Sequence, residues 1–301
     1  MSLPNKTNLL PDRPGIPPMA PMPEAETLDI PALADSYARG DIDLICVLGP
    51  TASGKTKYAV QLARALGREG LPGAYARIGS RSDAEGSPSL PKAEILSADS
   101  RQVYTGMDIG TGKDLREYGE VPYHLIDLVP AGSKFNIYQY QAAFAEAYAD
   151  VRSRGAIPIL CGGSGLYIES VTRAYKFDKE NGVPAERLPQ KTFYIGTLVS
   201  REERVERIDR RLDERLEEGL VEEVRGLLDS GIPPEDLLWY GLEYKFVTQY
   251  ILGELSYDEM HILLANAIHQ FAKRQMTWFR GMERDGVRIH WSAPNLSKAD
   301  G

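Results

Sequence analysis

The chain of 301 residues is 43% hydrophobic and 26% charged, with 35 lysines and arginines against 43 aspartates and glutamates and a net charge of −8. This composition excludes a wholly disordered chain, and no apolar run reaches the roughly 18 residues that a membrane-spanning helix needs. The two cysteines, Cys46 and Cys161, cannot form a disulfide scaffold, and the N-terminus lacks a signal-peptide pattern. We therefore expect a cytoplasmic protein in which both thiols are buried.

The N-terminal segment differs in composition from the rest of the chain. Residues 1–23 contain seven prolines and few large apolar side chains. Such a segment cannot bury enough apolar surface to offset the conformational entropy lost on ordering. We predict a disordered proline-rich tail over residues 1–40 and one folded domain over residues 41–295.

Within that domain, apolar runs of strand length alternate with stretches of helical periodicity. Strands are predicted at 42–48, 94–97, 123–128, 157–161, 192–199 and 287–291, helices at 58–66, 138–153, from 166, at 201–228 and at 260–280, and a polar loop at 77–92. Alternating strands and helices indicate right-handed βαβ units. The pattern therefore predicts an α/β fold with a parallel sheet and helices on both faces.

Gly49–Thr56, between the first strand and the first helix, matches the phosphate-binding pattern G-x-x-x-x-G-K-[ST]. Its glycines allow a tight turn in which backbone N–H groups converge on one anion, and the helix N-terminus adds partial positive charge. The predicted phosphate-binding residues are Gly49, Thr51, Ala52, Ser53 and Gly54. Lys55 is expected to reach terminal phosphate oxygens, and the Thr56 hydroxyl to meet Mg²⁺ or a phosphate oxygen. The fold is therefore predicted to be P-loop NTPase-like, with a small helical lobe, although the loop alone does not say which bond breaks.

Polar residues follow three other predicted strands. In an open α/β sheet the ligand lies outside the carboxyl ends of the strands. Asp99 and Asp127 each stand at such an end, so each is interpreted as a general base, as an acid near Mg²⁺, or as an ordinary turn residue. Ser164, in the glycine-rich turn after residues 157–161, is interpreted either as a donor to phosphate or as part of an ordinary turn.

Six motifs occur in a fixed order along the chain. They are Gly-Pro-Thr-Ala-Ser-Gly-Lys-Thr (49–56), Ser-Ala-Asp-Ser-Arg-Gln-Val-Tyr (97–104), Gly-Met-Asp-Ile-Gly-Thr-Gly-Lys (106–113), Val-Pro-Tyr-His-Leu-Ile-Asp (121–127), Gly-Gly-Ser-Gly-Leu-Tyr (162–167) and Phe-Ala-Lys-Arg-Gln-Met-Thr-Trp-Phe-Arg (271–280). Together they resemble the tRNA dimethylallyltransferase (isopentenyltransferase) family, relatives of the P-loop kinases, over residues 41–291. The six motifs in order are far more specific than the P-loop alone.

The resemblance implies transfer of a dimethylallyl group from dimethylallyl diphosphate to the exocyclic N6 of an adenine, which in the tRNA enzymes lies just 3′ of the anticodon. The P-loop would then hold diphosphate as the leaving group, with Lys55, Thr56 and Mg²⁺ neutralising its growing charge. Asp99 stands where the family has its general base, which takes a proton from N6 as the new bond forms.

The same resemblance implies further site residues. Arg211 stands where a family arginine grips the diphosphate, and Arg207 lies one helical turn away on the same face. Ser164 replaces the family's more usual threonine and keeps the hydroxyl. The residues that match the acceptor-binding stretch are Ser100, Arg101 and Gln102, of which Gln102 is expected to read the edge of the adenine ring. The expected catalytic residues are Asp99, Lys55, Thr56 and Arg211.

The chain departs from the family pattern at three places. Only 14 residues, 178–191, stand where the tRNA enzymes carry a helical insertion that embraces the anticodon stem, so this insertion is predicted to be absent. Tyr240-Gly241-Leu242-Glu243 replaces a Gly-Tyr-Lys/Arg run, and Ile268-His269 replaces a Thr-Arg pair. Each change is expected to remove a group suited to contact RNA or phosphate.

These departures leave alternatives open. The short architecture is similar to the adenylate isopentenyltransferases, which act on free AMP, ADP or ATP, whereas the motifs at 106–113 and 271–280 resemble the tRNA branch. We favour tRNA on the number of motifs. The basic and aromatic side chains at 271–280 are interpreted either as an RNA-binding cluster or as an ordinary amphipathic helix. A small-molecule kinase and a catalytically silent nucleotide-binding module are the alternatives from other classes. We expect a monomer that needs Mg²⁺.

Overall fold

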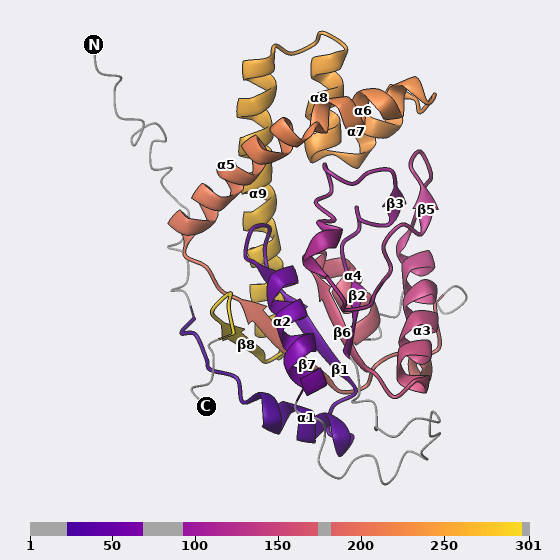
Figure 1. Cartoon of the computed structure of the whole chain (residues 1–301), viewed down its shortest axis with the longest axis vertical. Coiled ribbons are helices and arrows are strands. Elements are labelled where there is room, and N and C mark those ends of the chain that lie inside the picture. The colour runs from indigo at the N-terminus through magenta and orange to yellow at the C-terminus, as the bar shows by residue number, and fades with distance from the viewer. Residues whose placement is uncertain (1–22, 69–92, 174–181, 297–301) are drawn as a thin grey trace.

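A computed structural model of the chain describes residues 23–68, 93–173 and 182–296 (Figure 1). The first 22 residues of the predicted tail, the loop at 77–92 and the first part of the 178–191 segment lie outside the described residues. The described part contains a six-stranded parallel sheet in the order β4-β2-β6-β1-β7-β8. The predicted α/β fold with a parallel sheet is confirmed.

The strands of this sheet are β1 (Leu44–Leu48), β2 (Ala93–Ser97), β4 (Tyr123–His124), β6 (Ile157–Gly162), β7 (Thr192–Thr197) and β8 (Ile289–Ser292). A separate two-stranded sheet pairs β3 (Tyr104–Thr105) with β5 (Val129–Pro130). The α-helices are α1 (Ile30–Ala38), α2 (Lys55–Arg68), α3 (Ile137–Ser153), α4 (Gly165–Thr172), α5 (Arg201–Glu218), α6 (Leu220–Asp229), α7 (Pro234–Tyr240), α8 (Leu242–Ile251) and α9 (Tyr257–Arg284). Two 3₁₀ turns lie at Leu115–Glu117 and Ala185–Arg187.

The central strand β1 is buried on both faces, as a parallel sheet between two helical layers requires. Leu44, Cys46 and Leu48 contribute to one hydrophobic core, which includes residues of α3, α4 and α9. Ile45 and Val47 face the opposite core, formed largely with α2. Both cysteines are buried, as predicted, and burial raises the pKa of the Cys161 thiol to about 12.

The helical lobe lies beyond the ends of the strands (Figure 1). The predicted single helix over 201–228 is in fact two helices, because Gly219 between α5 and α6 adopts a left-handed φ of 106°. A residue with this φ cannot continue a right-handed helix, and glycine adopts it without steric cost. Helices α7 and α8 complete the lobe and were not predicted individually. The long helix α9 connects the lobe to the sheet.

Two predicted segments require correction. The strand over 123–128 ends at His124, because Leu125 and Asp127 adopt left-handed φ values of 66° and 58° that break an extended backbone. The predicted disordered tail does not reach residue 40. Helix α1 forms over Ile30–Ala38 and buries Leu33 and Ala34 in the core beside α2.

Candidate active site

The sheet register brings three loops to one edge. Leu48 at the end of β1 is level with Gly162 of β6, and Ser97 at the end of β2 is level with Cys161 of the same strand. The P-loop, the Asp99 loop and the Gly163–Ser164 turn follow directly from these strand ends. The common edge that the sequence predicted for these groups is therefore present.

The P-loop is held in a constrained turn. Ala52 and Gly54 adopt left-handed φ values of 62° and 79°. A Cβ at Gly49 would lie 2.2 Å from the Thr197 hydroxyl oxygen, so only glycine fits there. The Ser53 side chain is fully buried and its Oγ lies 2.6 Å from Thr197 Oγ1, so this hydroxyl shapes the loop from within.

Thr51 is tied to a residue that the sequence analysis did not single out. Its backbone N–H and its hydroxyl both donate to Oε1 of Gln275, at 2.8 and 3.1 Å. Gln275 lies on α9, more than 200 positions away along the chain, and its own Nε2 donates to the Gly163 carbonyl at 2.9 Å. The only signal in the sequence was its presence in the 271–280 motif.

Lys55, at the first position of α2, lies within the electrostatic field of three predicted site residues. Burial lowers the pKa of its ammonium, and the Asp99 carboxylate opposes that shift. Positive charge on Arg211 and Arg101 lowers the pKa further. The structure therefore brings the predicted base, the P-loop lysine and the predicted diphosphate-binding arginine together at one site.

Asp99 is half-buried and sits at the start of a turn. One carboxylate oxygen accepts the backbone N–H of Arg101 at 3.0 Å, and within the described residues the other oxygen accepts no hydrogen bond. The neighbouring Ser100 N–H donates to Ser164 Oγ at 3.0 Å, and Ser164 Oγ lies 3.2 Å from Ser100 Oγ. Ser164 thus supports the loop that carries Asp99. The second carboxylate oxygen of Asp99, which accepts no hydrogen bond from the described residues, can accept a proton.

A buried ionic triad adjoins this loop. Glu243 is 2% exposed and accepts hydrogen bonds from Arg101 and, at 3.0 Å, from Nη1 of Arg215. Burial and the charge of Arg211 lower the pKa of Arg215 to about 10, so its guanidinium stays charged at neutral pH. Glu243 stands where the family pattern has a cation. This position therefore lacks a basic group, as the sequence indicated, and instead carries a carboxylate that binds two arginines.

Arginines of α5 line a cavity of about 450 Å³ beside the P-loop. It includes Arg207, Arg211 and Arg215, which are four residues apart and share one helix face, together with Ala52 and Gly54 of the loop. Arg211 pairs with Asp114, and Arg207 Nη1 lies 3.5 Å from the Ala52 carbonyl oxygen. The four-residue spacing that placed Arg207 on the same face as Arg211 could have identified Arg215.

Two predicted residues have contacts that point to internal roles. Gln102 is 8% exposed, and its amide accepts from Ser97 Oγ and donates to the Gly112 carbonyl. Asp127 forms an ion pair with the buried Lys113, which also binds Asp108. Gln102 therefore anchors the 106–113 loop in this structure. Asp127 neutralises a buried lysine, a contact that the sequence did not predict.

The 271–280 segment is divided between surface and core. Phe279 is fully buried, whereas Trp278 is 41% exposed and donates from Nε1 to Glu169. The guanidiniums of Arg101 and Arg274 lie 5.7 and 5.8 Å from the centre of the Phe271 ring. The basic and aromatic groups near the exposed side of α9 thus reach the triad at Arg101.

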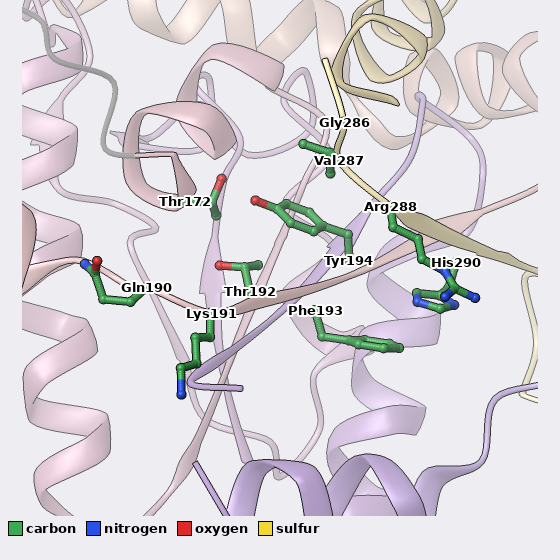
Figure 2. Close-up of a pocket in the computed structure, with 10 residues that line it drawn as sticks. All are labelled: Thr172, Gln190, Lys191, Thr192, Phe193, Tyr194, Gly286, Val287, Arg288 and His290. Atoms are coloured by element: carbon green, nitrogen blue, oxygen red, sulfur yellow. The ribbon is translucent and has the colours of Figure 1, made fainter. Parts of the chain in front are cut away.

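A second cavity, of about 420 Å³, lies at the other end of β7, where that strand begins. Figure 2 shows the side chains of Thr172, Thr192 and Tyr194 grouped on one side of it and His290 on the other. None of the predicted site residues lines this cavity. It is separate from the candidate active site, which lies at the opposite ends of the strands.

The described residues contain no cluster of three or more histidine, cysteine, aspartate or glutamate side chains able to hold a metal ion. They also contain no helix long and apolar enough to cross a membrane.

Comparisons with solved structures support the fold. A tRNA isopentenylpyrophosphate transferase from Bacillus halodurans aligns with a TM-score of 0.67 and 26% identity, covering 86% of this chain and 92% of that one. A tRNA delta(2)-isopentenylpyrophosphate transferase from Staphylococcus epidermidis gives a TM-score of 0.65 and 27% identity, covering 83% and 93%.

Sequence relatives are more similar still. A tRNA dimethylallyltransferase 2 of Bacteroides fragilis is 42% identical over 313 aligned positions, which cover 85% of this chain and 94% of the relative. A tRNA dimethylallyltransferase 1 of Parabacteroides distasonis is also 42% identical, with 83% and 92% covered. The first alignment has 313 positions, more than the 301 residues of this chain, yet it covers only 85% of the chain. The relative therefore carries residues within the aligned span that this chain lacks.

A family model described as IPP transferase matches residues 102–192 and 177–282. The two matches overlap at residues 177–192. This overlap includes the segment 178–191, where the sequence predicted that a helical insertion is missing. The absence of the insertion stays a prediction. The chain belongs to the IPP transferase family, whose curated members named above are tRNA dimethylallyltransferases.

Proposed function

We propose that this protein transfers a dimethylallyl group from dimethylallyl diphosphate to N6 of an adenine in tRNA, at the adenosine 3′ of the anticodon. One observation carries the proposal. This member of the family has a phosphate-binding loop, and the Asp99 carboxylate lies within the electrostatic field of Lys55. A kinase can use the same two parts, so the choice of prenyl transfer over phosphoryl transfer rests on the family. The carboxylate supplies the base that a weak amine nucleophile requires.

Binding of the donor begins with its diphosphate. Backbone N–H groups of the P-loop and the N-terminus of α2 provide the anion site, and Lys55 adds positive charge below its lowered pKa. Arg211 and Arg215 on α5 face the same region and suit bidentate contact with phosphate oxygens. Together these groups stabilise the negative charge that grows on the diphosphate as the bond between carbon 1 and oxygen breaks.

The acceptor reacts at the allylic carbon of the donor. As the diphosphate leaves, the N6 lone pair forms the new bond to carbon 1, and N6 becomes positively charged. The oxygen of Asp99 that accepts no hydrogen bond from the described residues takes the N6 proton, so the product is a neutral secondary amine and a diphosphate anion. Ser164 and the Arg101 N–H hold the loop while this transfer occurs.

Magnesium fits this site as a partner of the diphosphate. Mg²⁺ retains several waters and commonly takes one or two protein oxygens together with substrate phosphates. The Thr56 hydroxyl in the first turn of α2 is the protein oxygen suited to hold it, consistent with the lack of a three-residue ligand cluster among the described residues. When bound, the ion would supply additional neutralisation of the leaving group.

The choice of tRNA over a free adenine nucleotide rests on the relatives. Those with 42% identity are named as tRNA enzymes, although the segment 178–191 is predicted to lack the helical insertion. The exposed Trp278 and the pair Arg274–Phe271 offer stacking and phosphate contacts of the kind that bind RNA loops. We further propose that the enzyme acts as a monomer in the cytoplasm, because one chain carries all of the groups described.

A single assay tests the proposal against its alternatives. Labelled dimethylallyl diphosphate is offered in parallel to an unmodified anticodon stem-loop and to AMP, ADP and ATP, with Mg²⁺, and the product is identified by mass. Addition of a dimethylallyl group to the stem-loop alone is the expected result. Transfer to a free nucleotide would favour the adenylate class, and ATP turnover without use of the prenyl donor would favour a kinase.

A further inference from the structure

Gln275 occupies a junction between two loops of the site. It is 7% exposed, and its side-chain amide makes three hydrogen bonds. The carbonyl oxygen accepts the N–H and the hydroxyl of Thr51 in the P-loop, at 2.8 and 3.1 Å. The amide nitrogen donates to the Gly163 carbonyl at 2.9 Å. One side chain of α9 thus binds both the donor loop and the turn after β6.

The fit of α9 against this turn is close. A Cβ at Gly163 would lie 2.4 Å from Nε2 of Gln275, and a Cβ at Gly165 would lie 2.3 Å from Cδ1 of Trp278. Side chains larger than hydrogen are therefore excluded from both positions. The register of β1 and β6 brings the two loops together, and the amide of Gln275 is closely packed between them.

Hydrogen bonds continue from the turn to the predicted base. The Ser164 N–H donates to the Ala98 carbonyl at 3.2 Å, and the Ser100 N–H donates to Ser164 Oγ at 3.0 Å. Arg101 N–H then donates to Asp99 Oδ1 at 3.0 Å. The P-loop and the Asp99 carboxylate are therefore joined, through Gln275, by an unbroken series of short-range contacts.

We propose that Gln275 is a positioning residue that fixes the distance between the diphosphate site and Asp99. The inference rests on the proposed function, because displacement at the allylic carbon needs the nucleophile and the leaving group on opposite sides of one atom. An error of about 1 Å in such an arrangement can lower the rate by about 100-fold. Gln275 touches neither reactant in this account and acts through the two loops that it holds.

Gln275→Met tests the proposal, because methionine has a similar volume but can form none of the three hydrogen bonds. The single-turnover rate constant, measured with enzyme in excess over an anticodon stem-loop, is insensitive to the fraction of folded enzyme. We expect it to fall at least about tenfold, while the Kd of inorganic pyrophosphate changes less than about threefold. An unchanged rate constant, or a rise in Kd equal to the loss of rate, would overturn the proposal.

Gln275→Glu separates the two halves of the contact. Its carboxylate can still accept from Thr51 but cannot donate to the Gly163 carbonyl, so hydrogen exchange should accelerate at 163–165 more than at 49–54. In Gln275→Met both segments should exchange faster. Protection of 163–165 unchanged in both variants would contradict the inference, and this readout does not depend on catalysis.

Gln249→Met on α8 is the matched control. Gln249 is partly exposed, and among the described residues its side chain bonds only to Glu254, at 3.2 Å. The rate constant and the hydrogen exchange of Gln249→Met should therefore match those of the unmodified protein. If the unmodified protein transfers no dimethylallyl group, the proposed function fails, whereas hydrogen exchange still tests the role of Gln275. Transfer by the unmodified protein at the same rate as Gln275→Met refutes the positioning role alone.

Discussion

At the scale of single residues, the proposed function assigns the chemical step to the carboxylate of Asp99. Asp99→Asn keeps the side-chain shape and its contact with the Arg101 N–H but removes the proton acceptor. We expect the rate of transfer to fall by about 10²–10⁴-fold, the usual contribution of a general base. Pyrophosphate affinity, measured by calorimetry, should change little, because the P-loop is intact. A near-normal turnover in this variant would show that another group takes the N6 proton.

The protonation state of Lys55 makes donor binding depend on pH. Burial lowers the pKa of this ammonium below that of an ordinary lysine. The positive charge is present below the lowered pKa and is lost as the pH rises through it. Pyrophosphate affinity should therefore begin to fall at a lower pH than an exposed lysine would give.

The measurement is a series of pyrophosphate binding constants between about pH 7 and pH 10.5, the upper limit being near the ordinary pKa of lysine. Lys55→Arg is the matched control, because arginine stays charged over this range, and it also corrects for titration of pyrophosphate itself. If the two proteins show the same pH dependence, the titration does not belong to Lys55.

At the scale of secondary structure elements, the arginines of α5 depend on a loop from another part of the chain. Gly112 adopts a left-handed φ of 60°, and a Cβ there would lie 1.7 Å from Nη2 of Arg215 and 2.7 Å from Nη2 of Arg211. The absence of a side chain at Gly112 therefore leaves the space that the two guanidiniums occupy.

Gly112→Ala should displace both arginines and weaken pyrophosphate binding by about tenfold, equivalent to about 1.4 kcal/mol. The affinity is measured by calorimetry. Gly253→Ala provides the control, because Gly253 has a similar φ of 77° but open space around its Cβ position. Equal loss of affinity in both variants would mean that backbone strain, and not displacement of the arginines, is the cause.

At the scale of the whole molecule, the proposed function requires a net negative protein to bind a negative RNA. The basic and aromatic residues of α9 provide a local exception to the overall charge of −8. Lys273→Gln combined with Arg274→Gln should raise the KM for an anticodon stem-loop. The affinity should also depend less on salt, because the slope of log affinity against log salt concentration falls by about one per lost phosphate contact. The KM for dimethylallyl diphosphate should stay unchanged.

The control for this charge change lies at the far end of β7. Lys191→Gln removes one charge beside the second cavity (Figure 2). This cavity lies at the start of β7, and the candidate active site lies at the opposite ends of the strands. Its KM for the stem-loop should match that of the unmodified protein. If it weakens RNA binding as strongly as the α9 variant does, net charge and not the position of the basic groups determines affinity.

Features that depend on residues close together in the sequence were predicted, and contacts between residues far apart in the sequence were not. The P-loop and its flanking strand and helix are encoded within about 25 consecutive residues, where apolar periodicity and glycine spacing are direct signals. Glu243 and Gln275 gave no comparable signal. Glu243 binds Arg101, which is 142 positions away, and Gln275 binds Thr51, which is 224 positions away. These contacts exist only once α8 and α9 pack beside the Asp99 loop and the P-loop.

The sequence by itself determined the alternation of strands and helices, the phosphate-binding loop, the acid at Asp99 and the family, because these depend on local pattern. Only the tertiary structure decided which polar residues lie at the candidate site and which have internal partners. It directs Gln102, Ser53 and Asp127 to internal partners, and it draws Arg215, Glu243 and Gln275 to the site. The physical reason is that a buried polar group must find a partner wherever the fold provides one, and local sequence does not specify that partner.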